Sequence, residues 1–226
     1  MTTTAGVLLA LTAIAAVVDW VAVAARRPAV EYAAKPLTTA GLVAVACTLD
    51  PVYADMRTAF VVALVLSLIG DVFLMLPGAR WFVPGLAAFL LAHIAYVVGF
   101  VVGPGSGAAL LVGVLIAAAV AVPMGLRLVR ALRRSAPELV VPVTAYVVVI
   151  AAMVACATGW GNPWAVVGAW LFFVSDALIG ETRFVHPTWS ATRWGPLAVI
   201  VTYHLGQAGL VETRAPGLGA GVWLAT

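Results

Sequence analysis

The stretch Thr58-AFVVALVLSLIGDVFLM-Leu76 decides the fold class of this chain. It is long and apolar enough to cross the hydrocarbon core of a bilayer as a helix. Its one charged residue, Asp71, would cost roughly 2.5–3.5 kcal/mol at the centre of such a helix, so we expect it to face a bundle interior or a wet cavity. A second acid, Asp176, has the same setting in Trp170-LFFVSDAL-Ile179. The two carboxyls therefore need a common explanation.

The composition of the whole chain excludes an ordinary soluble domain. Of its 226 residues, 64% are hydrophobic and 9% are charged, and the mean hydropathy is +1.12, whereas soluble domains carry about 25% charged residues. The net charge of +3 comes from cations at helix ends and in short loops, which fits membrane topology better than nucleic-acid binding. The sequence predicts an integral membrane protein with no nucleic-acid partner.

The apolar runs predict an all-α, polytopic transmembrane helical bundle of about eight spans. Turn signals such as Pro77-Gly78 and Gly161-Asn162-Pro163 separate the runs, and no stretch is long enough for a second domain, so residues 1–226 form one integral membrane domain. No basic residue precedes Arg26, so the first run is expected to be a retained helix. The predicted spans are Ala5–Ala25, Pro36–Leu49, Thr58–Leu76, Phe82–Val102, Gly107–Leu126, Leu139–Thr158, Trp164–Gly180 and Pro196–Val211.

The cations predict the orientation of this bundle. Odd-numbered connections hold ten of them, and the even-numbered side holds only Arg57 and Arg214. The positive-inside rule then places the odd connections in the cytoplasm and both termini outside. The ten are Arg26, Arg27, Lys35, Arg80, Arg127, Arg130, Arg133, Arg134, Arg183 and Arg193.

This topology makes Asp71 and Asp176 comparable, because their helices run in the same direction and both residues fall in the cytoplasmic half. The helix after Asp71 carries His93 and Tyr96, one turn apart on one face, and the helix after Asp176 carries further polar residues. The correspondence is compatible with parallel four-helix pseudo-repeats. The polar residues of the last helix are Tyr203, His204 and Gln207.

Two readings of the buried acids remain open from the residues alone. Both can be structural, capped by hydroxyl groups such as that of Ser67, or they can share one proton and so provide an acid and a base together. Tyr96, Tyr146 and Tyr203 can donate hydrogen bonds into the same interior. His93 and His204 are either packing residues or ligands.

Metal and disulfide chemistry find little support in the spacing of these residues. No HxxE, HxxH or DxxD pattern accompanies the histidines, and Cys47 and Cys156 are isolated in apolar runs. We therefore predict no metal site and no organic cofactor.

Lys35, the only lysine, stands at the predicted cytoplasmic start of the second span. It is either a positive-inside anchor or a contact for the phosphate of a lipid headgroup. No lysine lies deep inside a span, which excludes a retinal Schiff base. Asp19, in the first span, receives no role from the sequence.

Several motifs follow one another along the chain in a fixed order: Lys35-Pro36-Leu37, Gly70-Asp71-Val-Phe-Leu-Met75, Phe82-x-x-Gly85-x-x-x-Phe89-x-x-x-His93-x-x-Tyr96, Ser175-Asp176 and Tyr203-x-x-x-Gln207. Together they resemble the YhhN-like lysoplasmalogenase family, over roughly Lys35 to Gln207. The first span carries no matching motif.

The resemblance implies a membrane hydrolase that cleaves the vinyl ether bond of a lysoplasmalogen to a fatty aldehyde and a glycerophospho-alcohol. Such cleavage needs a neutral acid beside a carboxylate, which we assign to Asp71 and Asp176 without deciding the order. Lys35 would hold the phosphate of the lysophospholipid. The remaining candidates, His93, Tyr96, Tyr146, Tyr203, His204 and Gln207, would orient the pair, the water or the substrate.

Two other functions are compatible with the same residues. Paired intramembrane acids also occur in proton-coupled transporters of small molecules or lipids, and a non-catalytic scaffold would tolerate the loss of both. We expect a bacterial plasma membrane, with membrane lipids around the bundle and a site that opens to the cytoplasm. The sequence does not define the headgroup preference or the oligomeric state.

Overall fold

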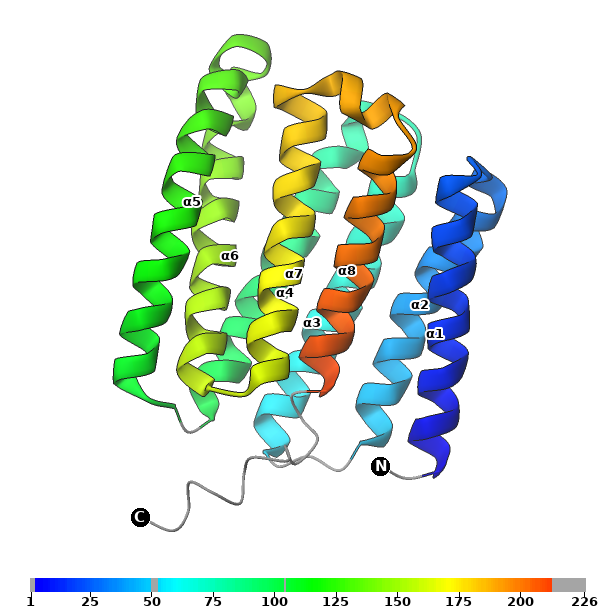
Figure 1. Cartoon of the computed structure of the whole chain (residues 1–226), viewed down its shortest axis with the longest axis vertical. Helices are drawn as coiled ribbons and strands as arrows, with labels where there is room; N and C mark the ends of the chain where they lie inside the picture. Colours follow the sequence, from blue (N-terminus) through cyan, green and yellow to red (C-terminus); the bar gives the residue numbers. More distant parts are fainter. Residues whose placement is uncertain (1–2, 50–52, 104, 213–226) are drawn as a thin grey trace.

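The computed structural model describes residues 3–49, 53–103 and 105–212 and places them in eight α-helices (Figure 1). The all-helical bundle predicted from the sequence is confirmed. The helices are α1 (Thr3–Ala24), α2 (Pro28–Thr48), α3 (Ala54–Met75), α4 (Phe82–Val102), α5 (Gly107–Ser135), α6 (Val140–Trp160), α7 (Pro163–Gly180) and α8 (Trp194–Glu212). Short 3₁₀ turns cover Ala79–Trp81, Pro137–Leu139 and Pro187–Ala191, and a π-turn, Glu181–Val185, continues α7.

Six of these helices are long and apolar enough to cross a membrane, namely all except α2 and α8. Those two carry polar groups on their buried faces, including Thr38 and Thr39 on α2 and His204 and Gln207 on α8. The outer face of the bundle is apolar, as Leu111 and Leu115 of α5 illustrate with 60% and 62% exposure. Soluble monomers rarely expose so much apolar surface. The protein is an integral membrane protein.

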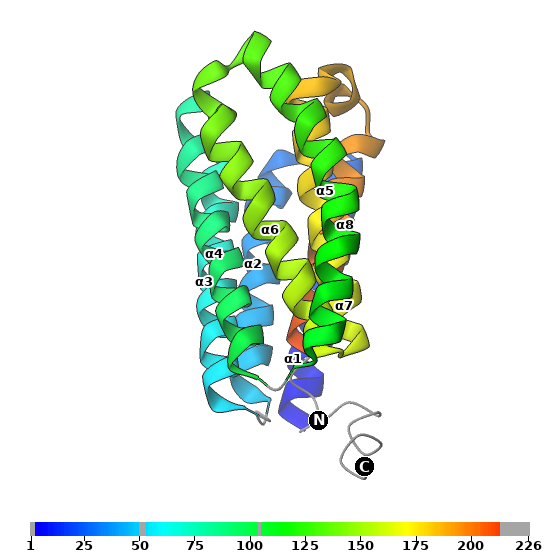
Figure 2. The same ribbon diagram turned by 90° about the vertical axis from the view of Figure 1, so that its left-hand side faces the viewer.

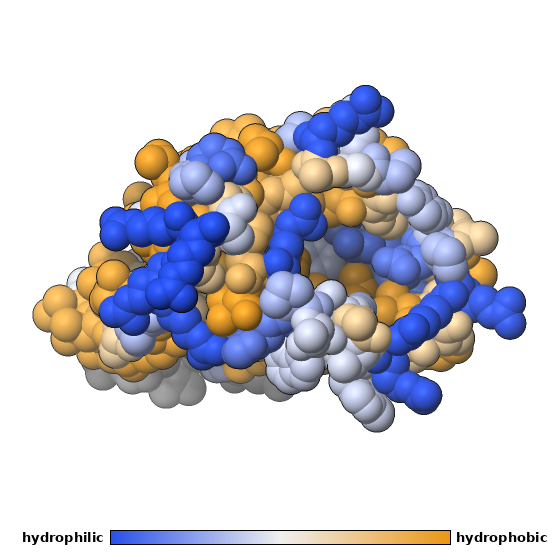
Figure 3. Space-filling model, turned by 90° about the horizontal axis from the view of Figure 1, so that it is seen from above, coloured by the Kyte–Doolittle hydropathy of each residue, from blue (hydrophilic) through white to orange (hydrophobic). Residues whose placement is uncertain are grey.

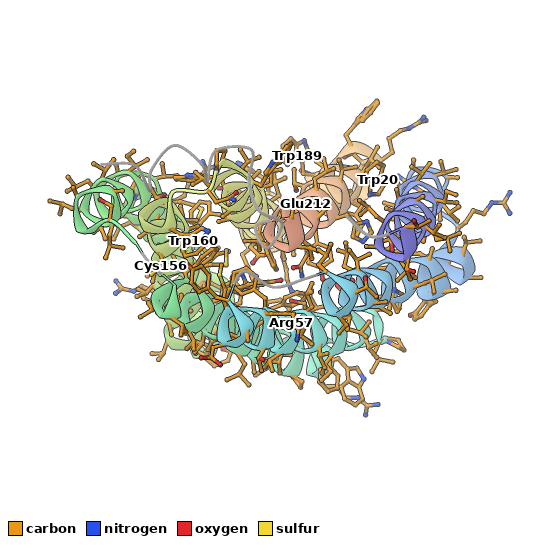
Figure 4. The ribbon with its side chains drawn as sticks, turned by 90° about the horizontal axis from the view of Figure 1, so that it is seen from below. Trp20, Arg57, Cys156, Trp160, Trp189 and Glu212 are labelled. Atoms are coloured by element: carbon orange, nitrogen blue, oxygen red, sulfur yellow. The ribbon has the colours of Figure 1, made fainter. Side chains whose placement is uncertain are left out.

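Two layers of helices enclose the interior. Helices α3 and α4 lie in one layer and α7 and α8 in the other, and α6 crosses obliquely between the layers along one side (Figure 2). It packs against α4, α5 and α7. On the other side α1 and α2 pack together, and both contact α8 (Figure 4).

Aromatic rings fill the space between the layers. Phe60 of α3 meets Tyr96 edge to face at 5.0 Å between ring centroids, and Phe172 of α7 meets both Phe89 and Tyr203 in the same manner. Edge-to-face pairs add to the apolar burial that holds the layers together. Polar side chains in this interior are therefore surrounded by rigid, apolar walls.

Glycines allow α7 and α8 to pack closely. A Cβ atom on Gly168 would lie 2.8 Å from the carbonyl oxygen of Gly206, and one on Gly206 would lie 2.7 Å from the backbone nitrogen of Phe172. Small residues at helix crossings are the usual device for close packing in membranes. This contact fixes α8, and with it Tyr203, relative to α7.

The helix ends follow local sequence signals. Asn162 is the N-cap of α7, and its side chain accepts hydrogen bonds from the backbone nitrogens of Trp164 and Ala165 at 2.9 and 3.3 Å. Gly161 ends α6 in the left-handed conformation, with φ of 78°. The predicted turn at Gly161-Asn162-Pro163 is confirmed.

Two helix boundaries differ from the prediction by more than a few residues. Helix α2 begins at Pro28 rather than at Pro36, because Pro28 stands in the first turn, where its missing N–H is not needed. Helix α5 continues to Ser135, beyond the expected end at Leu126, so that Arg127, Arg130, Arg133 and Arg134 lie on its last turns. Apolar runs mark the membrane-embedded part of a helix and not its full length.

The cations gather at one end of the bundle. The α1–α2, α3–α4, α5–α6 and α7–α8 connections share that end, and Thr3 and Glu212, the first and last described residues, lie at the other (Figure 1). Arg57 lies near the end that carries Glu212 (Figure 4). Asp50, Pro51, Pro104 and Arg214 lie outside the described residues. The assignment of the arginine-rich end to the cytoplasm, and the four-helix pseudo-repeats, stay predictions.

Candidate active site

Asp71 is fully buried in the last two turns of α3, toward the arginine-rich end of the bundle, and several hydrogen-bond donors face it. Its Oδ2 accepts hydrogen bonds from the hydroxyls of Thr39 and Tyr203, each at 2.7 Å. Its Oδ1 lies 3.3 Å from the Lys35 ammonium nitrogen. Lys35 and Thr39 are one turn apart on α2 and so present both groups on one helix face. Three elements, α2, α3 and α8, thus meet at this carboxylate.

Lys35 is more deeply placed than its sequence position suggested. We predicted it just before the second span, but α2 begins at Pro28, so Lys35 lies about two turns inside the helix. Its side chain is 15% exposed, and the ammonium nitrogen lies 5.8 Å from the centre of the Tyr203 ring. Lys35 therefore contacts Asp71 while part of its side chain remains accessible.

Asp176 on α7 has different neighbours. Its Oδ2 accepts a hydrogen bond from the Tyr146 hydroxyl at 2.5 Å and lies 3.7 Å from Nε2 of His93. Nδ1 of His93 lies 2.6 Å from the backbone carbonyl oxygen of Phe89. Because a carbonyl oxygen only accepts, Nδ1 carries a hydrogen, and Nε2 of the neutral ring is an acceptor that faces Asp176.

The surroundings of the two carboxyls are joined through aromatic rings. Phe172 lies 4.6 Å from the ring of His93 and 5.3 Å from the ring of Tyr203. Asp71 and Asp176 are close enough to interact electrostatically. The structure therefore places both acids predicted from the sequence in the same aromatic interior, each with a tyrosine donor.

Gln207 links two of the predicted tyrosines. The Tyr96 hydroxyl donates to its side-chain oxygen at 2.5 Å, and its side-chain nitrogen donates to the Tyr203 hydroxyl at 3.3 Å. Since the Tyr203 oxygen accepts this bond, its own hydrogen is directed to Asp71. Gln207 and Tyr96 thus support the orientation of Tyr203.

An apolar cavity lies beside Asp176 between α4, α5, α6 and α7. The Asp176 side chain is 13% exposed, whereas that of Asp71 is 0% exposed. Tyr146 and Phe89 also line the cavity, so it ends against the aromatic residues of the site. The other lining residues are Leu74, Phe82, Leu86, Met124, Leu128, Val143, Val147, Ile150, Phe173, Ala177, Ile179, Gly180, Glu181 and Phe184.

His204 lies apart from both acids. We grouped it with the orienting residues, but its Nδ1 accepts a hydrogen bond from the Trp20 indole at 3.1 Å, and its Nε2 lies 4.0 Å from Asp19. Figure 4 shows Trp20 between α1 and α8. No role for Asp19 follows from the sequence, which contains no pattern that would pair Asp19 with His204.

Three hydroxyl side chains also have partners or positions that the sequence did not predict. Thr39 was overlooked, although its spacing of four residues from Lys35 was a usable signal. Ser67, proposed as a cap for Asp71, has no hydrogen-bond partner for its Oγ within the described part of the chain. Ser175 donates to the backbone carbonyl of Val199 instead of to a carboxyl.

A metal does not unite these residues. Among residues 3–49, 53–103 and 105–212, no group of three or more His, Cys, Asp or Glu side chains is placed to hold a metal ion. Hydroxyl, ammonium and imidazole groups are the partners of the two carboxyls. The arrangement can hold one carboxyl ionised and the other protonated.

The fold and the site define a class: polytopic helical membrane proteins with a pair of carboxyls in the bundle interior. The chain belongs to the YhhN family, whose model matches residues 30–214. The family resemblance of the sequence motifs is thereby confirmed. No solved structure matches the chain.

Curated relatives carry a consistent name. The chain is 37% identical over 147 residues to a human protein named lysoplasmalogenase TMEM86B, covering 64% of this chain and 58% of the relative. It is 36% identical over 153 residues to proteins named lysoplasmalogenase from Mycobacterium bovis and Mycobacterium tuberculosis, covering 64% of this chain and 56% of each relative. The chain thus aligns with little more than half of the length of these relatives.

Proposed function

We propose that this protein is a membrane hydrolase that cleaves the vinyl ether bond of lysoplasmalogens, releasing a fatty aldehyde and a glycerophospho-alcohol. The observation that carries the proposal is the contrast between two interior carboxyls, one surrounded by donors and the other facing an acceptor. The names of the relatives support the substrate class. Vinyl ether hydrolysis needs such a contrast, because an acid must protonate carbon while a base activates water.

Asp71 is the carboxylate of this pair. Two hydroxyls and one ammonium group are directed at its oxygens, and groups that donate to a carboxylate favour its ionised form. The Lys35 ammonium has no lone pair to accept a proton from Asp71, and both hydroxyls donate to this carboxyl in the structure. Asp71 is therefore suited to stabilise a neighbouring cation and to take a proton from water.

Asp176 is the acid. Tyr146 donates to it, but His93 presents the lone pair of Nε2 to the same oxygen. A protonated carboxyl supplies the hydrogen that this acceptor lacks. Asp176 also borders the apolar cavity, where an alkenyl chain would place its double bond beside the acid.

The two groups complete a balanced cycle. Asp176 gives its proton to the terminal carbon of the O–CH=CH unit, which leaves an oxocarbenium ion next to the oxygen. Water adds to that ion as Asp71 takes a water proton, and a hemiacetal forms. Asp71 then protonates the departing glycerol oxygen while the hemiacetal hydroxyl returns its proton to Asp176, so that aldehyde and alcohol leave and both carboxyls regain their starting forms.

The surroundings of the pair also fit the two ends of the substrate. Lys35, whose side chain is partly accessible, is a phosphate contact on the α2 side of Asp71. The cavity bounded by α4, α5, α6 and α7 accepts an apolar chain on the Asp176 side. The reacting bond of a lysophospholipid lies between these two parts of the molecule. The arginine-rich end, which the positive-inside rule places in the cytoplasm, would be the side of entry.

The test uses detergent-purified protein and three lysolipids that differ only in how the hydrocarbon chain is linked to the first glycerol carbon. The alkenyl compound should release aldehyde, whereas the alkyl ether and the acyl ester should not. In D₂O the trapped aldehyde should carry one deuterium from the enzyme at the carbon next to the carbonyl. If the folded protein releases no aldehyde from the alkenyl lipid, the proposal is overturned.

Proton-coupled transport stays the alternative for the same acids. An enzyme releases aldehyde in detergent without any gradient, whereas a carrier moves substrate only across a sealed membrane. Flux measurements in vesicles, with and without a pH gradient, therefore separate the two functions. Solute uptake without aldehyde release would favour transport.

A further inference from the structure

A second group of buried polar side chains lies between α1 and α8 and takes no part in the proposed reaction. Asp19 and Trp20 come from α1, and His204 comes from α8. The Trp20 indole donates to Nδ1 of His204 at 3.1 Å. Because the indole nitrogen can only donate, Nδ1 is the acceptor, and the hydrogen of the neutral ring lies on Nε2, 4.0 Å from Asp19 Oδ2.

Three polar atoms of this group are unusual for a protein interior. Within the described residues, the two carboxylate oxygens of Asp19 and Nε2 of His204 have no hydrogen-bond partner. The side chains are 0% and 2% exposed. Burying a carboxyl without donors is costly, and buried polar groups in native proteins nearly always have partners. Asp19 is thus a buried acceptor directed at a place where a donor belongs.

The charges around Asp19 indicate what that donor is. Lys35 and Asp71 lie within electrostatic range of Asp19, so that one cation serves two acids. Lys35 has three N–H donors, and its contact with Asp71 leaves others for an anionic ligand. A ligand with a negative group for Lys35 and a positive group for Asp19 would complement this pattern.

Aromatic surfaces and an open end support binding at this place. The Trp20 and His204 rings stack with centroids 6.3 Å apart, and Tyr203 lies 5.4 Å from His204. Ring faces attract cations, including alkylammonium groups. Viewed from the arginine-rich end, the surface is hollowed toward the α1 and α2 side, with hydrophilic side chains inside the hollow (Figure 3).

We propose that Asp19, Trp20 and His204 bind the ammonium group of a zwitterionic lysophospholipid headgroup, while Lys35 binds its phosphate. The inference rests on the proposed function and names the headgroup class of its substrate. In such a lipid the phosphate stands between the ammonium and the vinyl ether, and Lys35 likewise interacts with both Asp71 and Asp19. Asp19 lies outside residues 30–214, which the family model matches.

The kinetic test compares alkenyl-glycerophosphoethanolamine with alkenyl-glycerophosphate, which lacks the ammonium. The wild type should prefer the first in kcat/KM, and Asp19→Asn should reduce this preference by about tenfold or more, as expected for a lost hydrogen bond to a charged group. The loss should appear in KM more than in kcat. Asp55→Asn is the control, because Asp55 is an exposed carboxyl in the first turn of α3, and its preference should match the wild type.

A binding test with saturated alkyl ether analogues keeps the inference independent of catalysis and of the folding of one variant. The ethanolamine analogue should raise the melting temperature of the wild type more than the alkyl-glycerophosphate does. Equal stabilisation by the two would overturn the headgroup site, as would an equal preference in Asp19→Asn and the wild type. Preferential binding without aldehyde release would instead overturn vinyl ether hydrolysis and leave the headgroup site standing.

Discussion

The ion pair between Lys35 and Asp71 allows a quantitative prediction. The two charged atoms are 3.3 Å apart, with side chains 15% and 0% exposed. Coulomb's law gives an attraction of about 5 kcal/mol at that distance for an effective dielectric constant of about 20. Desolvation of both groups offsets much of it, so we expect a coupling free energy of about 2 kcal/mol between them.

A double-mutant cycle measures this coupling. Lys35→Met leaves Asp71 buried without its cation, and Asp71→Asn leaves Lys35 without its anion, so each change alone should lower the free energy of unfolding. The double variant loses the attraction only once and should be less destabilised than the sum. Denaturant unfolding in one detergent, followed by circular dichroism, gives the four free energies.

A matched pair in the same chain serves as the control. Arg127 and Glu181 also lie 3.3 Å apart, but their side chains are 53% and 22% exposed. Exposed ion pairs typically have coupling free energies of about 0.2–1 kcal/mol. Equal coupling in the two cycles, or additive effects at Lys35 and Asp71, would refute the argument that burial makes the inner pair strong.

Three further changes test the packing, a helix cap and the acid. Gly168→Ala should destabilise the fold by about 1–3 kcal/mol, because its Cβ would lie 2.8 Å from the Gly206 carbonyl oxygen. A Cβ at Gly107 meets no atom within 4 Å, so Gly107→Ala is the control and should stabilise the fold slightly. Melting temperatures in detergent compare the two variants, and equal losses would contradict the packing argument. Asn162→Ala should cost about 0.5–2 kcal/mol, because the N-cap of α7 is lost, and an unchanged free energy of unfolding would show that the cap is dispensable. Tyr146→Phe should lower kcat about tenfold or more by removing the donor to the acid, and unchanged aldehyde release would remove Tyr146 from the site.

Much of the architecture could be predicted because the bilayer constrains it so strongly. A run such as Thr58–Leu76 has few alternatives to a membrane-spanning helix. A carboxyl within it faces the bundle interior because exposure to lipid is costly. The burial of Asp71 and Asp176 therefore follows from cost alone. The shared end of the cations followed from counting connections.

The helix ends and the long-range pairs could not be predicted in the same way. Hydropathy does not detect the polar turns that lengthen α2 and α5. It therefore predicts Lys35 at the membrane surface, whereas in the structure Lys35 lies inside α2 and contacts Asp71. The contact between Lys35 and Asp71 depends on how α2 packs against α3, and that of Asp19 with His204 joins the first and last helices. No local pattern encodes such pairs, although Lys35 and Thr39, one turn apart, already hinted at a shared partner.

The most direct test of the catalytic carboxyl pair is aldehyde release from alkenyl-glycerophosphoethanolamine by Asp71→Asn and Asp176→Asn, each verified as folded by its melting curve. Asp55→Asn is the control, because Asp55 is an exposed carboxyl in the first turn of α3, at the opposite end of the bundle. We predict that both inner variants lose turnover by at least about a hundredfold, the usual contribution of general acid–base catalysis, while the control retains it. Turnover near that of the wild type in either folded inner variant would contradict the catalytic carboxyl pair.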